Sequence, residues 1–573
     1  MILKALYDYY HRCGNLPKPG TELKEIGFLI VIDKDGNFLR FEDRRIDKKQ
    51  AQKFLVKKHV GRTSALAANY LYDNSGYVFG YSDKGDSSAQ YKTFKCKIES
   101  IYEAHLDNKD IAAVWKFYQH EQAFILNQMK RDSLWGEIEK NLNKKYSTFS
   151  FLIDGDTKIV AEKAELFDED SKREVDGGQV CIISGEKGKT VETTTATMIP
   201  GSQATAKLVA FQVSSGYDSY GKTKGGNAPI SEEAEFAYTT ALNHLLASDS
   251  RNKFLIGSRT FLFWASKNDE AGQKAEDSFF SLFGFQDIGD DPNRGIEQVR
   301  KVFEAIYKGT LKSSSDDIFY ILGLAPNAAR IAVTYWAEIP LQQFAETICK
   351  HFDDMEVIDT RLEKKPYMSL RNIISTVTLG GKISDATPNL PEAVVKSIFE
   401  GLPYPHTLFA SCIRRIRAES GEKDKNAVHV TRAAIIKAYL NRLNNKEQKI
   451  KVMLDKENNN QGYLCGRLFA VLDKIQEEAN NQHSIRERYM NSASSTPAAV
   501  FSTILNLSNH HVENLKNEGR KIYFEKLKQE IISKIDADGF RPQLDLQDQG
   551  RFFIGYYHQR QDFFTKSEEN NNE

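Results

Sequence analysis

The spacing of apolar residues changes at about Ile339, and this change constrains the fold more than any other feature. Beyond it, successive segments place apolar residues three and four positions apart, which gives a helix one apolar face. Examples are LQQFAETICKHF, EAVVKSIFEGL and RAAIIKAYLNRL. Loops rich in Pro, Gly, Asn or Asp separate the segments, and Thr496 followed by Pro497 is typical of a helix start. The second part of the chain is therefore predicted to form a helical bundle.

The first part mixes strands and helices without a regular alternation. Residues 28–33 (FLIVID) read as a buried strand, KDGN as a hairpin turn, and FLRF as the returning strand. Further strands are predicted at 77–81, 149–153 and 179–183, and helices at 1–13 and about 92–141. Because no βαβ rhythm is present, the predicted class is α+β. The chain is expected to form a mixed N-terminal α/β region with small antiparallel sheets, followed by the C-terminal helical bundle.

A length of 573 residues exceeds what one core can organise, so two to four domains are expected. We place a mixed α+β region at 1–345, a basic helical region at 346–452 and a C-terminal bundle at 453–573. The six cysteines are scattered, which fits reduced thiols in the cytoplasm and no zinc-type pair. Neither a signal peptide nor an apolar run of membrane-spanning length is present, so no membrane partner is expected.

Charge is segregated within a chain whose total is neutral. The 78 basic and 78 acidic residues cancel, so a nucleic-acid binder of this composition needs local basic patches. Lys53 to Lys97 holds 8 Lys/Arg against 3 Asp/Glu, and Gly401 to Lys451 holds 11 against 4. A solvated helix face is the ordinary interpretation of one charge run. Two uncompensated regions favour binding to a polyanion.

The segment Lys53–Gly80 combines cations, short amides and tyrosines. Its cations suit phosphates, its amides and hydroxyls suit base edges, and its aromatic faces suit unpaired bases. The candidate contacts to a base are Thr63, Ser64, Asn69, Tyr72 and Asn74, and the candidate contacts to phosphate are Lys57, Lys58 and Arg62. The alternative is a solvated basic face followed by a Tyr-rich strand in a core.

Two further segments could contact nucleic acid. The Gly-rich loop 216–231 carries Lys222 and Lys224, and glycine lets backbone amides approach an anion closely. A mobile surface linker is the alternative. The run CIRRIRAE holds Arg414, Arg415 and Arg417, of which the first and last share a helix face. These arginines could line a groove for a single strand, or form a solvated face or a subunit interface.

No catalytic or metal-binding pattern emerges. GEKGKT at 185–190 lacks the first glycine of a phosphate-binding loop, since Ile183 stands there, and a polar turn is predicted instead. His510 and His511 are adjacent on a predicted helix and point to different faces, so they cannot share one metal. We therefore expect no cofactor, no metal and no reaction of the chain's own.

Several blocks resemble one family, in family order and over nearly the whole chain. They are MILKALYDYYHR, EIGFLIVIDKDGNF, RTS followed by NYLYDNSGYVFGY, CIISGEKGK, and the segments 215–246, 319–336 and 466–480. Together they resemble the large subunit of type I-C CRISPR surveillance complexes (Cascade). The resemblance implies an antiviral DNA-binding subunit that recognises the PAM, a short motif flanking the target, helps open the duplex into an R-loop and stabilises the displaced strand.

The resemblance also implies partners. These are the guide RNA complex, the double-stranded target with its displaced strand, the repeated backbone subunit, the guide-end-binding subunit, the small subunit, and the helicase-nuclease that docks on the large subunit. Two alternatives remain open at this point. One is a DNA-processing nuclease with an unrecognised active site, and the other is an architectural subunit without DNA contact.

In the resembled family, the C-terminal helical part is also made separately, from a start inside the same gene, as the small subunit. Met453 lies in a polar loop before a helical unit, and 121 residues extend from it to Glu573. That length suits a bundle of about three or four helices. Met490 is a poorer candidate because a start there would discard the helix GRLFAVLDKI.

Overall fold

The computed structural model divides into two compact units, each built from separated segments of the chain. It describes residues 1–14, 16–48, 50–60, 66–83, 85–144, 146–163, 178–197, 199–203, 205–211, 218–247, 249–283, 294–360, 368–387, 389–422, 426–443, 448–479 and 485–569. Unit 1 comprises Met1–Arg12, Thr194–Ala210 and Leu242–Glu573, and unit 2 comprises Cys13–Thr193 and Phe211–Ala241. The boundaries predicted at residues 345 and 452 stay predictions.

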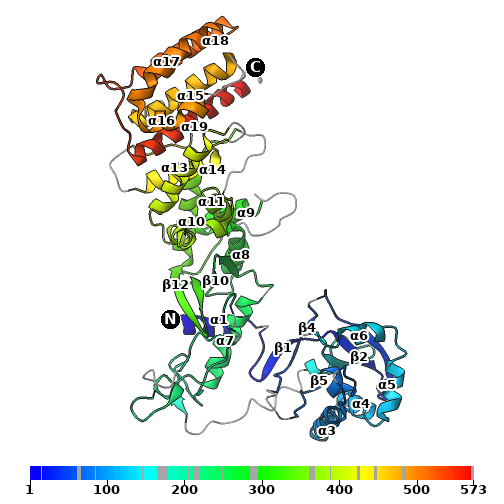
Figure 1. Ribbon diagram of the computed structural model, residues 1–573. Coiled ribbons are helices and arrows are strands. Elements are labelled where there is room, and N and C mark those ends of the chain that lie inside the picture. The colour runs from blue at the N-terminus through cyan, green and yellow to red at the C-terminus, as the bar shows by residue number, and fades with distance from the viewer. Residues whose placement is uncertain are drawn as a thin grey trace. The chain divides into compact units, whose positions relative to one another are not determined.

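Unit 2 is organised around a mixed four-stranded sheet in the order β3-β2-β6-β5 (Figure 1). Its strands are β2 (Phe28–Ile32), β3 (Phe38–Asp43), β5 (Tyr72–Asp73) and β6 (Phe149–Ile153). The hairpin predicted around KDGN is confirmed, because β2 and β3 are antiparallel and Asp33 accepts hydrogen bonds from the turn at Asp35 and Asn37. β2 and β6 run parallel, as their separation in the sequence permits.

Helices and a second small sheet complete unit 2. The helices α3 (Ser88–Ala104), α4 (Lys109–Phe117), α5 (Gln122–Met129) and α6 (Trp135–Asn141) confirm the predicted helical stretch. The short elements are α2 (Ser75–Val78), η1 (Val160–Glu162), η4 (Lys224–Asn227) and the paired strands β1 (Thr21–Glu25) with β4 (Lys53–Lys57) and β7 (Gln179–Val180) with β8 (Lys187–Gly188). α7 (Glu232–Leu246) continues from unit 2 into unit 1.

Two predicted strands differ from the structure. The strand at 77–81 is wrong, because Asn74 caps a helical turn and its side chain accepts a hydrogen bond from the Tyr77 amide. The strand predicted at 179–183 ends after Val180, because the Cys181 thiol accepts hydrogen bonds from the amides of Ile183 and Ser231 and fixes a turn. The polar turn predicted after this strand lies at residues 182–184, and residues 185–190 contain the whole of β8.

Unit 1 begins with a four-stranded antiparallel sheet in the order β12-β11-β10-β9. Its strands are β9 (Lys253–Ile256), β10 (Arg259–Ala265), β11 (Ile318–Asn327) and β12 (Arg330–Pro340). The helices that accompany it are α1 (Ile2–Arg12), α8 (Glu270–Phe279), η5 (Phe280–Phe283) and α9 (Arg294–Tyr307). Aromatic rings fill the space between sheet and helices, with Phe279 packed edge-on against Phe263 and Phe319.

The rest of unit 1 is helical, as the apolar spacing predicts. It contains α10 (Leu341–Met355), α11 (Leu370–Ser375), η6 (Ile383–Asp385), α12 (Leu390–Phe399), α13 (His406–Glu419), α14 (Val430–Arg442), α15 (Gln461–Ala479), α16 (Ile485–Ser495), α17 (Pro497–Glu513), α18 (Glu518–Ile532) and α19 (Leu546–Glu569). α17 starts at Pro497 with Thr496 as its N-cap residue, as predicted. The α+β class is therefore confirmed.

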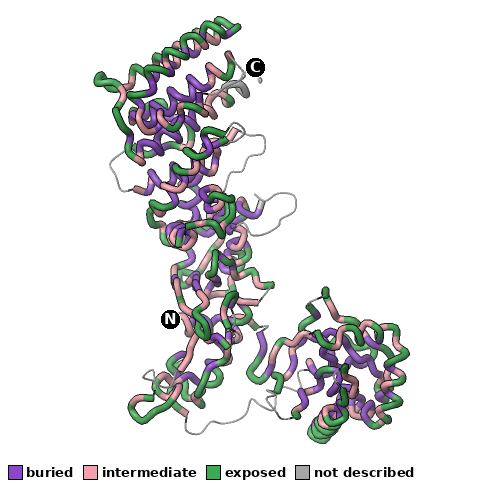
Figure 2. Tube along the Cα trace, in the orientation of Figure 1, coloured by how far each residue is buried: buried purple, intermediate pink, exposed green. Residues whose placement is uncertain are grey.

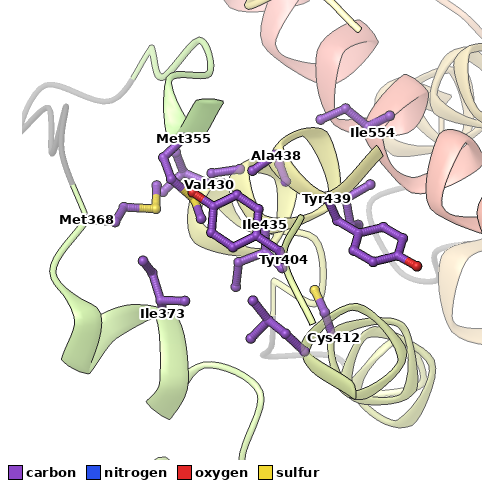
Figure 3. Close-up of a cluster of buried hydrophobic side chains, with 14 of the residues drawn as sticks. Met355, Met368, Ile373, Tyr404, Cys412, Val430, Ile435, Ala438, Tyr439 and Ile554 are labelled. Carbon is purple, nitrogen blue, oxygen red and sulfur yellow. The ribbon is translucent and has the colours of Figure 1, made fainter. Parts of the chain in front are cut away.

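One continuous apolar core links these helices to the sheet. It extends from Phe254 in β9 to Tyr557 in α19. Figure 3 shows part of it, where side chains of α10, α11, α13, α14 and α19 form one cluster around Tyr404 and Cys412. Exposed residues are frequent on the outer helices α17 and α18, whereas α15 is buried from Gln461 to Asp473 (Figure 2). None of the helices in the described ranges is long and apolar enough to cross a membrane.

Candidate nucleic-acid interfaces

In unit 2, the basic segment begins on β4 and surrounds Tyr70. The Lys57 ammonium lies 4.4 Å from the centre of the Tyr70 ring, and the Lys97 ammonium lies 6.0 Å from it. The Tyr70 hydroxyl is 3.3 Å from the His105 Nε2 atom. Lys58 directly follows the end of β4. It is exposed and has no ion-pair partner among the described residues. In its described part, the segment therefore presents the exposed Lys58 and two lysines, Lys57 and Lys97, held against an aromatic face.

Asn69 and Tyr72 are buried and support the backbone around this segment. Asn69 is 8% exposed, and its Oδ1 atom accepts a hydrogen bond of 2.9 Å from the Val60 amide. Tyr72 is 0% exposed, and its hydroxyl can donate to the Lys57 carbonyl at 2.9 Å or to Glu22 Oε1 at 3.0 Å. Both side chains therefore hold the backbone at Val60 and Lys57. Arg62, Thr63 and Ser64 lie outside the described residues.

Backbone strain occurs between these two side chains. Leu71 adopts a left-handed conformation with φ at 63°, which is costly for a residue with a branched side chain. Asp73 holds the strained turn, since its carboxylate accepts hydrogen bonds from the amides of Asn69 (3.0 Å) and Asn74 (2.9 Å). The turn is thus fixed by buried polar contacts. Such contacts hold the side chains beside the turn in one geometry.

Asn74 is the one exposed amide of the predicted set in the described chain. Its Oδ1 atom accepts a hydrogen bond of 3.3 Å from the Tyr77 amide and caps α2. Its Nδ2 group has no hydrogen-bond partner among the described residues, so a donor faces solvent. A donor of this kind suits an acceptor on a base edge.

The Gly-rich loop presents one of its two lysines freely. Lys222 is exposed and makes no ion pair with any described residue. Lys224 instead forms an ion pair with Glu192, whose pKa is lowered by this contact. Gly225 is required where it stands, because a Cβ atom there would lie 2.3 Å from the Val191 carbonyl oxygen. The loop is therefore packed against Val191 at Gly225, whereas residues 220–223 are exposed.

The three arginines of α13 are divided between solvent and an interior ion pair. Arg414 and Arg417 are exposed, and their guanidinium groups have no partner in the described part of unit 1. Arg415 forms an ion pair with Glu419. Arg414 and Arg415 line a cavity of about 280 Å³ between α13 and residues 377–390. The predicted face of two free arginines is present, and it borders a concave surface.

Glu419 carries a second, buried partner that the sequence did not indicate. Arg432 of α14 is 4% exposed, and its Nη1 atom lies 2.5 Å from Glu419 Oε2. Burial alone would raise the pKa of Glu419, but hydrogen bonds and charge interactions with Arg432 and Arg415 outweigh it and lower the pKa to about 2. One carboxylate therefore holds two guanidinium groups, which leaves one positive charge in excess.

Other cations of the second basic patch point inward. Lys437 donates to the carbonyls of Asp353 and Asp354, and Arg442 is held by the Asp354 carboxylate at 2.6 Å. These contacts fix the packing of α14 against α10. Charge counting along the sequence therefore overstates the surface charge of residues 401–451. The distinguishing signal is that Lys437 and Arg442 lie within the apolar run RAAIIKAYLNRL.

No cluster of metal-ligating side chains occurs within the described ranges. No curated protein matches the chain. The sequence profile of the CRISPR-associated protein family Cas_Csd1, however, matches residues 6–564. This match spans both units and confirms the resemblance drawn from the sequence. The chain therefore belongs to the Cas_Csd1 family of CRISPR-associated proteins and is a subunit of a Cascade complex.

Proposed function

We propose that the chain is the large subunit of a type I-C Cascade in the cytoplasm, where it recognises the PAM, helps open the duplex and holds the displaced strand. Guide pairing cannot begin until the duplex opens, so a protein must first capture a short duplex stretch. The observation that carries the proposal is the family match over residues 6–564, together with the exposed Lys58 and the amide donor of Asn74 on the segment that resembles the family signature.

PAM contact is assigned to the surface around residues 58–74 of unit 2. Asn74 Nδ2 supplies a donor for a base edge, and Lys58 supplies a charge for a phosphate. The direct contacts predicted from sequence for Asn69 and Tyr72 stay predictions. The geometry favours a positioning role for both, because their polar atoms bind the backbone at Val60 and Lys57. Lys222 provides a further phosphate contact, with Lys224 held by Glu192.

The displaced strand is assigned to the exposed face of α13 in unit 1. Arg414 and Arg417 share this face and lack partners in the described part of the chain. A single strand needs cations that follow its backbone rather than a reading of base pairs. The helicase-nuclease is expected to dock on the same subunit, and the guide RNA, the repeated backbone subunit and the guide-end-binding subunit complete the assembly.

We assign no reaction to this subunit, which acts by binding. This part of the proposal is tested by incubating the purified chain with single- and double-stranded DNA in Mg²⁺ and Mn²⁺. Intact DNA after prolonged incubation is the expected result. Cleavage that tracks the protein through purification would favour the alternative, a nuclease.

Duplex binding tests the PAM assignment. Asn74→Ala should weaken binding of a PAM-containing duplex by about 1–3 kcal/mol, whereas binding of other duplexes stays the same. Lys58→Ala should weaken all duplexes alike and reduce the slope of log affinity against log salt by about 0.9. Thermal unfolding of each variant controls for the lost helix cap. If both variants bind PAM and non-PAM duplexes as the wild type does, the PAM site lies elsewhere.

A further inference from the structure

Two hollows in unit 1 share a short segment of their lining, which we call the ridge. The larger has a volume of about 440 Å³ and the smaller about 280 Å³, and both are lined by Thr378 and Leu379. These two residues lie between α11 and η6, followed by Gly381 in a left-handed turn with φ at 66°. Leu379 is 82% exposed although it is apolar, so its side chain projects from the ridge between the hollows.

The larger hollow is rich in hydrogen-bonding side chains. The polar residues that line it include Asn372, Ser375, Thr376, His429 and Thr431. His429 Nε2 is 2.9 Å from Thr376 Oγ1, which joins the residue before α14 to the residue after α11 in the lining of the hollow. Amides, hydroxyls and imidazoles are the groups that pair with the edges of an unpaired base.

The charged residues that line the two hollows are three arginines and two acids, which leaves an excess of one positive charge. Arg414 and Arg415 line the smaller hollow, and Arg432 and Glu419 line the larger. Because Glu419 binds both Arg415 and Arg432, this carboxylate neutralises only one of them. Asp385 also lines the smaller hollow, and Arg414 is the lining arginine there that has no ion-pair partner among the described residues, so an anion is expected at Arg414.

We propose that these hollows bind two successive nucleotides of an unpaired DNA strand, with the Leu379 side chain between the two bases and Arg414 on a phosphate. The inference rests on the proposed role in holding the displaced strand and assigns its position. A duplex keeps its bases stacked and paired and offers only its backbone and grooves, so it would leave the ridge and the larger hollow unused. A single strand can use the charge, the polar hollow and the apolar side chain together.

The test measures binding of the full chain to a labelled single strand and to the duplex of the same sequence by fluorescence anisotropy. Leu379→Ala should weaken single-strand binding about fivefold and leave duplex binding unchanged, since it removes one apolar contact to a base. Leu379→Met keeps an apolar side chain and should bind as the wild type does. Leu402→Ala is the matched control, because Leu402 is also exposed (46%) in unit 1.

A second readout reports the bases directly. A strand carrying 2-aminopurine brightens when the probe is unstacked, and this rise should occur with the wild type and be lost with Leu379→Ala. Arg414→Ala should reduce the salt slope of single-strand binding by about 0.7. Equal single-strand affinity of the wild type and Leu379→Ala would overturn the inference, as would an equal loss for single strand and duplex.

Failure of the ridge as the binding site and failure of the proposed strand binding give different results. If reversal of Arg414 and Arg417 weakens single-strand binding but Leu379→Ala does not, the strand is held on α13 and the ridge is not its site. If the wild-type chain binds no single strand, both fail. If a peptide of the helicase-nuclease protects the amides around Leu379 from hydrogen exchange and the single strand does not displace that peptide, the ridge is a protein docking site. The inference is then overturned.

Discussion

The shared carboxylate of Glu419 makes a quantitative prediction about the helical part of unit 1. Glu419→Gln keeps the side-chain volume but removes the charge that holds Arg415 and the buried Arg432. Lowering the pKa of the carboxyl from 4.5 to about 2 corresponds to about 3 kcal/mol of stability. Breaking a buried ion pair by removing one partner costs a similar amount, about 3–5 kcal/mol.

Hydrogen exchange measured by mass spectrometry suits a chain of two units, because it reports local opening. Amides of α13 and α14 should lose protection about hundredfold in Glu419→Gln at pH 7, since each 1.4 kcal/mol is a factor of ten. Arg414→Ala is the matched control on the same helix and should leave protection unchanged, since its guanidinium has no partner among the described residues. Protection within threefold of the wild type in Glu419→Gln would refute the reasoning.

The same contact has a defined pH dependence. Because the pKa of Glu419 is lower in the folded state, its contribution is fully present above pH 4.5 and is lost as the pH falls through about 2. The difference in free energy of unfolding between the wild type and Glu419→Gln should therefore shrink over this range. A difference that stays constant down to pH 2 would assign the stabilisation to packing rather than to charge.

Three further outcomes follow from the structure. Asn69→Ala should weaken PAM-duplex binding while leaving the slope of log affinity against log salt unchanged, since its carboxamide holds the Val60 amide; an altered slope would indicate a phosphate contact instead. Charge reversal at Arg414 and Arg417 should leave PAM capture normal and lower the yield of opened target, and unchanged opening kinetics would exclude this face. Expression of the intact gene should give a second product beginning at Met453 that Met453→Leu removes, and an unchanged small product in the variant would exclude that start.

Local patterns predicted much of the fold. The hairpin at 28–41, the helices from Leu341 onward and the start of α17 at Pro497 each follow from side-chain spacing or from a cap. The strand predicted at 77–81 was wrong because the hydrogen bond to Asn74 outweighs the strand preference of its tyrosine and valine. Whether the Asn74 side chain caps a helical turn or the segment forms a strand depends on the backbone geometry, which the residue types alone do not show.

The candidate sites were predictable in part. The exposure of Arg414 and Arg417 follows from helical spacing, and the structure agrees. The pairing of Glu419 with Arg432 depends on how two helices pack, which no local pattern encodes. The ridge at Leu379 was missed for the same reason, since a single leucine in a Gly-rich turn stands out only when its exposure is known.

The first helix has a consequence for synthesis. α1 belongs to unit 1, where Arg12 lies 2.9 Å from Glu276, a residue 264 positions later in the chain. At ribosomal rates of about 5–20 residues per second, α1 waits roughly 10–50 s for this partner. Residues up to Thr193 of unit 2 emerge within that interval and can condense first. Until then α1 remains an exposed amphipathic segment. Such a segment is a natural target for a chaperone that binds nascent chains.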